Sequence, residues 1–105
     1  MSLPQTLQEP LDAARSMVSR AHAIDLYLQI GNAKAMLANA RAFVVEEPLT
    51  GEAFEETGRR IDRLVGARDF DDARQSVLQA IDSLELSLRH ARPNVHAKAL
   101  GVDWF

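Results

Sequence analysis

The chain has 105 residues, which is the length of one domain that can bury a modest core without metals or disulfides. It has 16 Ala and 13 Leu against 14 Val, Ile and Thr together, a balance that favours helices over strands. The lack of Cys excludes disulfides, thiolate metal sites and a cysteine nucleophile, and a net charge of −3 from interspersed charges excludes a basic nucleic-acid footprint.

The compartment expected from these features is the cytoplasm. Residues 1–10 lack the basic region and apolar run of a signal peptide, and the longest apolar run, residues 23–30, is too short to cross a bilayer. We therefore expect no membrane association. We expect one helical domain over residues 1–105, with residues 1–9 as a lead-in and residues 93–105 as a tail.

Two apolar stripes predict helical structure between residues 10 and 46. Pro10 suits a first helical turn. The stripes follow three- and four-residue spacing and consist of Leu11, Ala14, Val18, Ala21, Ile24 and Leu28, then Leu26, Ile30, Ala33, Leu37, Ala40 and Val44. Either the chain breaks at Gly31-Asn32 and Asn32 caps a separate helix, or residues 10–46 form one helix kinked at Gly31. We favour the single helix, because one Gly costs only about 1 kcal/mol there and a two-residue antiparallel turn is tight.

A second helix is predicted over residues 51–65. Thr50 is the expected N-cap, and Leu49 is expected to pack on Phe54 as a hydrophobic staple. Gly66 is placed to follow the helix as its C′ residue. The side chains expected in the core are Phe54, Ile61, Leu64 and Val65, and the pairs expected at the surface are Glu55 with Arg59 and Glu56 with Arg60.

The clearest helix is predicted over residues 69–92, which contain no Gly and no Pro. Carboxylates fill its first turn and basic residues its last, as the helix dipole favours, and Pro93 follows. Its apolar stripe is Phe70, Ala73, Val77, Ala80, Ile81, Leu84 and Leu88. The short link at Gly66-Ala67-Arg68 predicts an antiparallel hairpin with the preceding helix. The expected fold is all-α, an antiparallel bundle of three or four helices.

His22, Asp25 and Gln29 share one helical face and form the candidate polar site. They would suit a bundle that binds a ligand or a metal ion. A carboxylate-bridged metal site in a helical bundle uses Glu-x-x-His pairs on facing helices, and the chain has none, so we favour a polar strip with no metal and no cofactor.

Catalytic motifs are missing from the sequence. It has no Gly-rich phosphate loop, no G-x-S-x-G and no H-E-x-x-H, so we expect no enzyme. Histidine phosphotransfer through His22 or His90 is the least favoured function, because Asp25 beside His22 would repel an incoming phosphoryl group.

Surfaces are more informative than sites in this chain. Small residues at helical spacing lie apart from the Leu26–Val44 stripe, so residues 24–44 are apolar on two sides. Such a helix is central in its own bundle or shared with another chain. The candidate interface residues are Gly31, Ala35, Ala38, Ala42, Leu78, Leu86, Trp104 and Phe105. The leading hypothesis is a protein–protein interaction module of adaptor, regulatory or chaperone-like type that forms a homodimer.

Overall fold

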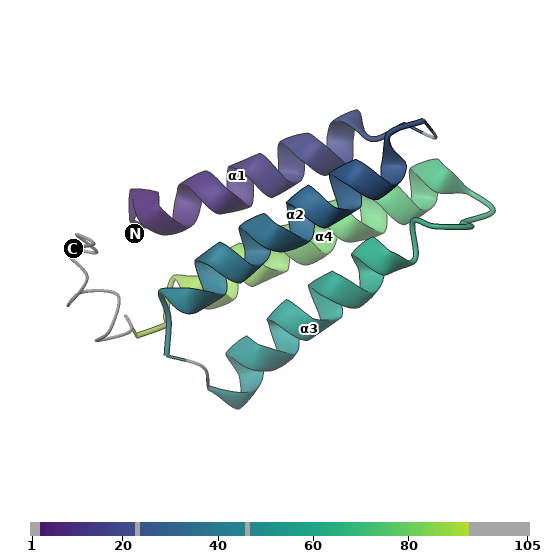
Figure 1. The fold of residues 1–105 in the computed structure, drawn as a ribbon. Helices are drawn as coiled ribbons and strands as arrows, with labels where there is room; N and C mark the ends of the chain where they lie inside the picture. The colour runs from purple at the N-terminus through teal and green to yellow at the C-terminus, as the bar shows by residue number, and fades with distance from the viewer. Residues whose placement is uncertain (1–2, 23, 46, 93–105) are drawn as a thin grey trace.

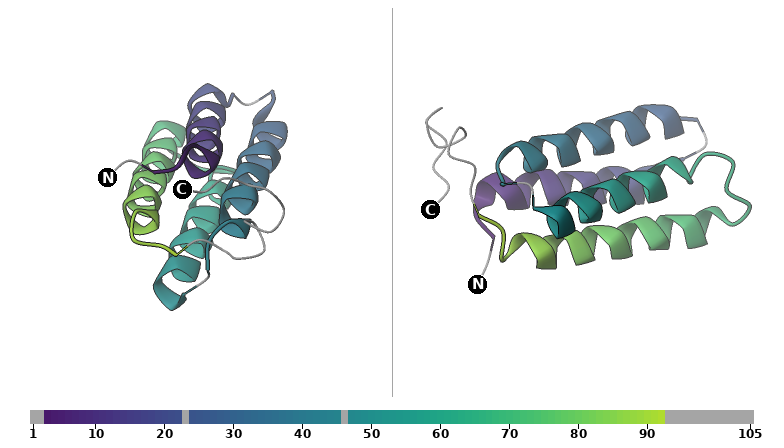
Figure 2. Two further views of the ribbon diagram at one scale, coloured as in Figure 1. Left: turned by 90° about the vertical axis from the view of Figure 1, so that its left-hand side faces the viewer. Right: turned by 90° about the horizontal axis from the view of Figure 1, so that it is seen from below.

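The computed structural model describes residues 3–22, 24–45 and 47–92. This part of the chain forms four helices: α1 (Gln5–Arg20), α2 (Leu26–Ala42), α3 (Pro48–Asp62) and α4 (Phe70–Leu88). They run alternately up and down (Figure 1), and the predicted all-α antiparallel bundle is confirmed. In the end-on view α2 lies between α1 and α3, diagonally opposite α4 (Figure 2). Among these helices, none is both long and apolar enough to cross a bilayer.

The prediction of one helix over residues 10–46 is wrong, and so is the alternative break at Gly31-Asn32. The chain reverses between the end of α1 at Arg20 and the start of α2 at Leu26 instead, and Gly31 and Asn32 lie inside α2. Folding back there lets Ala14 and Val18 of the first stripe and Ala33 and Leu37 of the second face one core. Helix α1 also begins before Pro10, because Leu7 extends the buried stripe by one turn.

The turn between α1 and α2 is fixed by a side chain from α4. The Arg74 guanidinium donates hydrogen bonds to the carbonyl oxygens of Val18, at 3.2 Å, and Ala21, at 2.6 Å. These carbonyls lie at the end of α1, where the helix provides few backbone donors; that of Val18 also accepts the Ala21 N–H at 3.3 Å. Within the turn, the Asp25 carboxylate accepts the backbone N–H of His22 at 2.8 Å.

The predicted apolar stripes are buried in the core wherever the predicted helix matches the observed one. Val77, Ala80, Ile81, Leu84 and Leu88 of α4 are buried as expected. The remaining buried apolar side chains come from every helix and from the adjoining turns, and include Leu7, Leu11, Leu37, Phe54, Ile61 and Leu64. Ile24 and Leu28, assigned to the first stripe by their spacing, are exposed, because the chain turns before it reaches them.

Helix α3 begins earlier than predicted. Glu47 is its N-cap and Pro48 its first residue, so Thr50 lies buried in the first turn and does not cap the helix. Leu49 is 85% exposed and makes no staple. Val65 is also exposed, because the helix has ended at Asp62.

The link between α3 and α4 is closer to the prediction. Gly66 has the left-handed conformation, with a φ of +74°, but it is not the predicted C′ residue, because the C-cap of α3 is Arg63. Asp69 caps α4 by accepting the backbone N–H of Asp72 at 3.0 Å. Helix α4 then ends at Leu88, four residues before the predicted end.

Candidate functional site

The polar residues singled out from the sequence lie at the α1–α2 turn. The His22 side chain is exposed, and the Asp25 carboxylate accepts the His22 backbone N–H at 2.8 Å and the Gln29 side-chain amide at 3.3 Å. The bond from the His22 backbone, with a smaller contribution from Gln29, lowers the pKa of Asp25. The carboxylate is therefore held in its charged form by the turn that it stabilises.

Metal ligands do not gather at this turn or elsewhere in the described part of the chain. Over residues 3–22, 24–45 and 47–92, no group of three His, Asp or Glu side chains is placed to hold an ion. His90 lies at the far end of α4 and is exposed. The structure thus brings Asp25 together with Gln29 and with the backbone of His22, and His22 lines a pocket at this turn together with Asp71 and Arg74 of α4.

The most distinctive surface is what we call the outer face of α2, formed by Leu28, Gly31, Ala35, Ala38 and Ala42 of the helix and by Ile24 in the turn before it, with Tyr27 at its edge. All of these residues are exposed, and the large ones strongly so: 101% for Ile24, 76% for Tyr27 and 64% for Leu28. At 100° per residue the five of these positions that lie within α2 fall within about 80° of one another, opposite the core. Water-facing helix surfaces ordinarily carry charge, but this one carries none.

A groove borders this face on the side of α3. It has a volume of about 240 Å³, and its apolar lining includes Leu37, Ala38 and Phe54. Gly58 leaves it open, because a Cβ built there would meet nothing within 4 Å. The small residues Ala38 and Gly58 therefore produce an indentation beside the outer face of α2.

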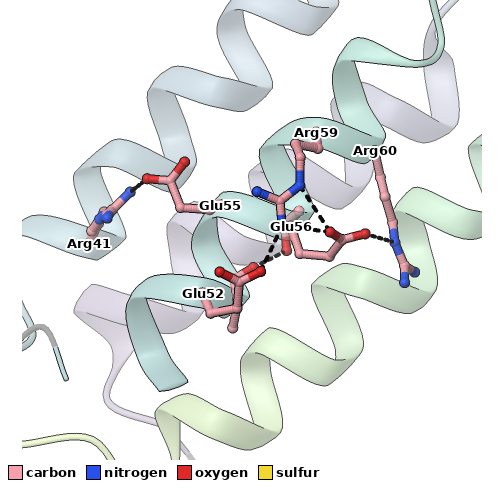
Figure 3. Close-up of polar contacts among 8 residues, drawn as sticks. Arg41, Glu52, Glu55, Glu56, Arg59 and Arg60 are labelled. Atoms are coloured by element: carbon pink, nitrogen blue, oxygen red, sulfur yellow. Dashed lines mark hydrogen bonds and ion pairs between the residues drawn. The ribbon is translucent and has the colours of Figure 1, made fainter. Parts of the chain in front are cut away.

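Ion pairs close the rim of this groove. Lys34 reaches Asp62 at 2.9 Å and Arg41 reaches Glu55 at 3.0 Å, so both cations of α2 are bonded to carboxylates of α3 (Figure 3 shows the second pair). The expected pair of Glu55 with Arg59 is therefore wrong. Glu55 bonds Arg41 across the groove and not Arg59 along its own helix, because its position on α3 faces α2.

Arg59 instead belongs to a ladder along α3 (Figure 3). Its guanidinium bonds Glu52 at 2.7 Å and Glu56 at 2.8 Å, and Arg60 bonds Glu56 at 3.0 Å, which confirms the expected pair of Glu56 with Arg60. Hydrogen bonds from Arg59 and Arg60 lower the pKa of Glu56. The exposed side of α3 is thus strongly charged, unlike that of α2.

A second groove borders the outer face on the side of α1. It has a volume of about 580 Å³ and is mostly apolar. Pro10 and Ala13 of α1 and Met36 of α2 lie along it, together with Phe43 just after α2. Apolar surface therefore continues from the outer face of α2 towards α1.

The other predicted interface residues lie elsewhere. Leu78 is partly buried against the core and belongs to the intramolecular packing. Leu86 is 57% exposed, and it is the only strongly exposed large hydrophobic residue within α4. Trp104 and Phe105 lie outside the described residues.

Two residues were not predicted from the sequence: Tyr27, at the edge of the outer face of α2, and Arg74, which bonds the end of α1. Tyr27 lies one turn before Gly31, so its spacing to the small residues could have placed it beside them. Arg74 carried no local signal for its bonds to α1, because Val18 and Ala21 lie more than fifty residues away in sequence.

Comparison of the chain with models of protein families, with curated proteins and with solved structures found no match.

Proposed function

We propose that this chain is a small protein–protein interaction module, with no catalytic role, that binds another chain through the outer face of α2. The supporting observation is the exposure of Ile24, Tyr27 and Leu28 at one end of a face with no charged side chain. Scattered exposed hydrophobic residues are common, whereas clustered ones mark interaction surfaces. Covering these three side chains would remove a large apolar area from water.

The chemistry of this face favours a helix as the bound element. Gly31, Ala35 and Ala38 have little or no side chain, so a second helix backbone could approach closely. Nucleic acid is a poor partner for a chain of net charge −3 whose Lys34 and Arg41 are bonded to α3 carboxylates. We propose the cytoplasm as the compartment, consistent with the lack of Cys.

Photo-crosslinking in cells that make the protein tests this function. A benzoylphenylalanine placed at Tyr27 lies at the edge of the outer face, and one placed at the exposed Gln75 of α4 serves as the matched control. We expect discrete protein adducts from position 27 and none of them from position 75. The proposal fails if position 27 gives no adduct or if both positions give the same adducts.

A further inference from the structure

We propose that the partner of the outer face of α2 is a second copy of this chain, packed antiparallel about a two-fold axis. This inference rests on the proposed function and names its partner. In the end-on view α2 occupies a corner of the bundle, so its outer face points away from the other helices (Figure 2). A second bundle can therefore approach α2 without displacing α1, α3 or α4.

The spacing of the outer face is the same in both directions. Its members from Leu28 to Ala38 are separated by 3, 4 and 3 residues, the spacing of a coiled-coil seam. An antiparallel two-fold therefore opposes each of these four members to another. The pairs are Leu28 with the partner's Ala38 and Gly31 with the partner's Ala35, and Ile24, in the turn before α2, lies towards the partner's Ala42.

Side-chain size favours this antiparallel register. The large residues, Ile24 and Leu28, stand at one end of the face and the alanines at the other. Antiparallel pairing sets each large side chain against an alanine at both ends. Parallel pairing would set Leu28 against Leu28 and Ala38 against Ala38, so the helices would be held apart at one end and a void left at the other.

The charged side chains beside the outer face are compatible with the antiparallel dimer. Tyr27, Lys34 and Arg41 lie on one flank of the outer face, and the two-fold axis sets that flank against itself. The Tyr27 ring then lies near the partner's Arg41, a cation that already lies over the Phe54 ring at 5.6 Å. The two Lys34 side chains also share this flank, but each is bonded to its own Asp62 at 2.9 Å.

The available area predicts a weak dimer. The face from Ile24 to Ala42 is about 28 Å long, and a strip about 10 Å wide gives roughly 550 Å² for two copies together. Stable interfaces bury about 1,200 Å² or more, so this face alone falls short. The apolar groove towards α1 adds surface at Ala13 and Met36. We expect a reversible dimer with a dissociation constant in roughly the micromolar range.

Disulfide trapping tests the register directly, because the natural chain has no Cys. The variants are Leu28→Cys and Ala38→Cys, alone and mixed in equal amounts with a mass tag on one of them. In the proposed dimer position 28 lies opposite the partner's position 38. Identical positions are about 15 Å apart along the helix, beyond the reach of a disulfide.

We expect at least about tenfold more cross-linked dimer in the mixture than in either variant alone. Mixing Leu28→Cys with Gln75→Cys is the control and should give only background. Cross-linking of each variant with itself would indicate parallel pairing, and equal yields in all samples would indicate random collision. Either result overturns the proposal.

Sedimentation equilibrium provides the second test. We expect wild type to shift from monomer to dimer with concentration, Ala38→Glu to weaken association at least about tenfold, and the matched surface variant Gln75→Glu to leave it unchanged. Equal thermal unfolding of the two variants would show that both fold. A wild type that stays monomeric at about 1 mM contradicts the dimer.

The photo-crosslinking experiment separates the two proposals. Adducts at position 27 that contain another protein and no second copy leave the interaction function standing and refute the dimer. No adduct at position 27 refutes both.

Discussion

At the scale of single residues, Arg74 joins α4 to the end of α1. It belongs to α4, ends α1 by donating to the carbonyls of Val18 and Ala21, and lies over the Phe70 ring at 4.7 Å. Its side chain is only 22% exposed, so water replaces these bonds poorly. Through these bonds the guanidinium holds the end of α1 against α4, next to the turn that contains the exposed Ile24.

We predict that Arg74→Ala lowers the free energy of unfolding by about 2 kcal/mol, because it leaves two carbonyls without a charged donor. Urea denaturation followed by circular dichroism measures this change. Arg74→Lys should recover part of the loss, since one ammonium can replace only some of the bonds. A loss below about 0.5 kcal/mol for the alanine variant would show that the cap is unimportant.

Glu56 makes a pH-dependent contribution to the free energy of unfolding. Its lowered pKa means that the folded state binds its proton more weakly than the unfolded state. The resulting stability is present above the unfolded-state pKa and is lost as the pH falls through the lower folded value. We predict that wild type exceeds Glu56→Gln in stability at pH 7 and that the difference shrinks once the pH falls below about 4. Urea titrations across this range measure it, and a difference independent of pH would contradict the assignment.

At the scale of elements, α2 is apolar on two faces with different environments. Leu37 points into the core and is 5% exposed, whereas Leu28 is 64% exposed on the outer face. In dilute protein we predict that Leu37→Ala costs about 2–4 kcal/mol and that Leu28→Ala costs less than about 0.5 kcal/mol. Thermal or urea unfolding of the two variants and of wild type measures these stability losses. Equal costs would mean that the outer face is already covered in the monomer.

Two glycines should respond to alanine in opposite directions. Gly66 has a φ of +74°, and Gly31 lies within α2; a Cβ would meet nothing within 4 Å at either position. Gly66→Ala should therefore lose about 1 kcal/mol through backbone strain, and Gly31→Ala should gain about 0.5–1 kcal/mol through helix propensity. Shifts of the same sign in the unfolding midpoint would contradict this contrast.

Local signals account for what the sequence predicted. The α4 stripe and the carboxylates of its first turn involve residues close in sequence, and Gly66 marks the chain reversal by itself. The α1–α2 turn was missed because the contacts made there, such as the bond from Arg74 to Ala21, join residues that are distant in sequence. The outer face was found in part for the same reason. Gly31, Ala35, Ala38 and Ala42 follow from spacing, whereas the exposure of Ile24 and Leu28 depends on where the chain turns.

At the scale of the whole molecule, the bundle consists of two helical hairpins, and polar contacts lie on both seams between them. Helix α1 packs most closely on α2, and α3 on α4. Arg15 bonds Asp82 at 2.9 Å and Glu85 at 3.0 Å across one seam, and Lys34 and Arg41 bond α3 across the other. Burial lowers the pKa of Arg15, but the hydrogen bonds to these two carboxylates outweigh it and raise the pKa overall.

The close packing of helices that are neighbours in sequence has a kinetic consequence. Contacts between α1 and α2, and between α3 and α4, close short loops, so little chain entropy is lost before apolar burial begins. Bundles of this kind have low contact order and fold in microseconds to milliseconds. We expect temperature-jump relaxation of this chain to be a single exponential in that range. A phase lasting seconds would show that the two hairpins form quickly but dock slowly.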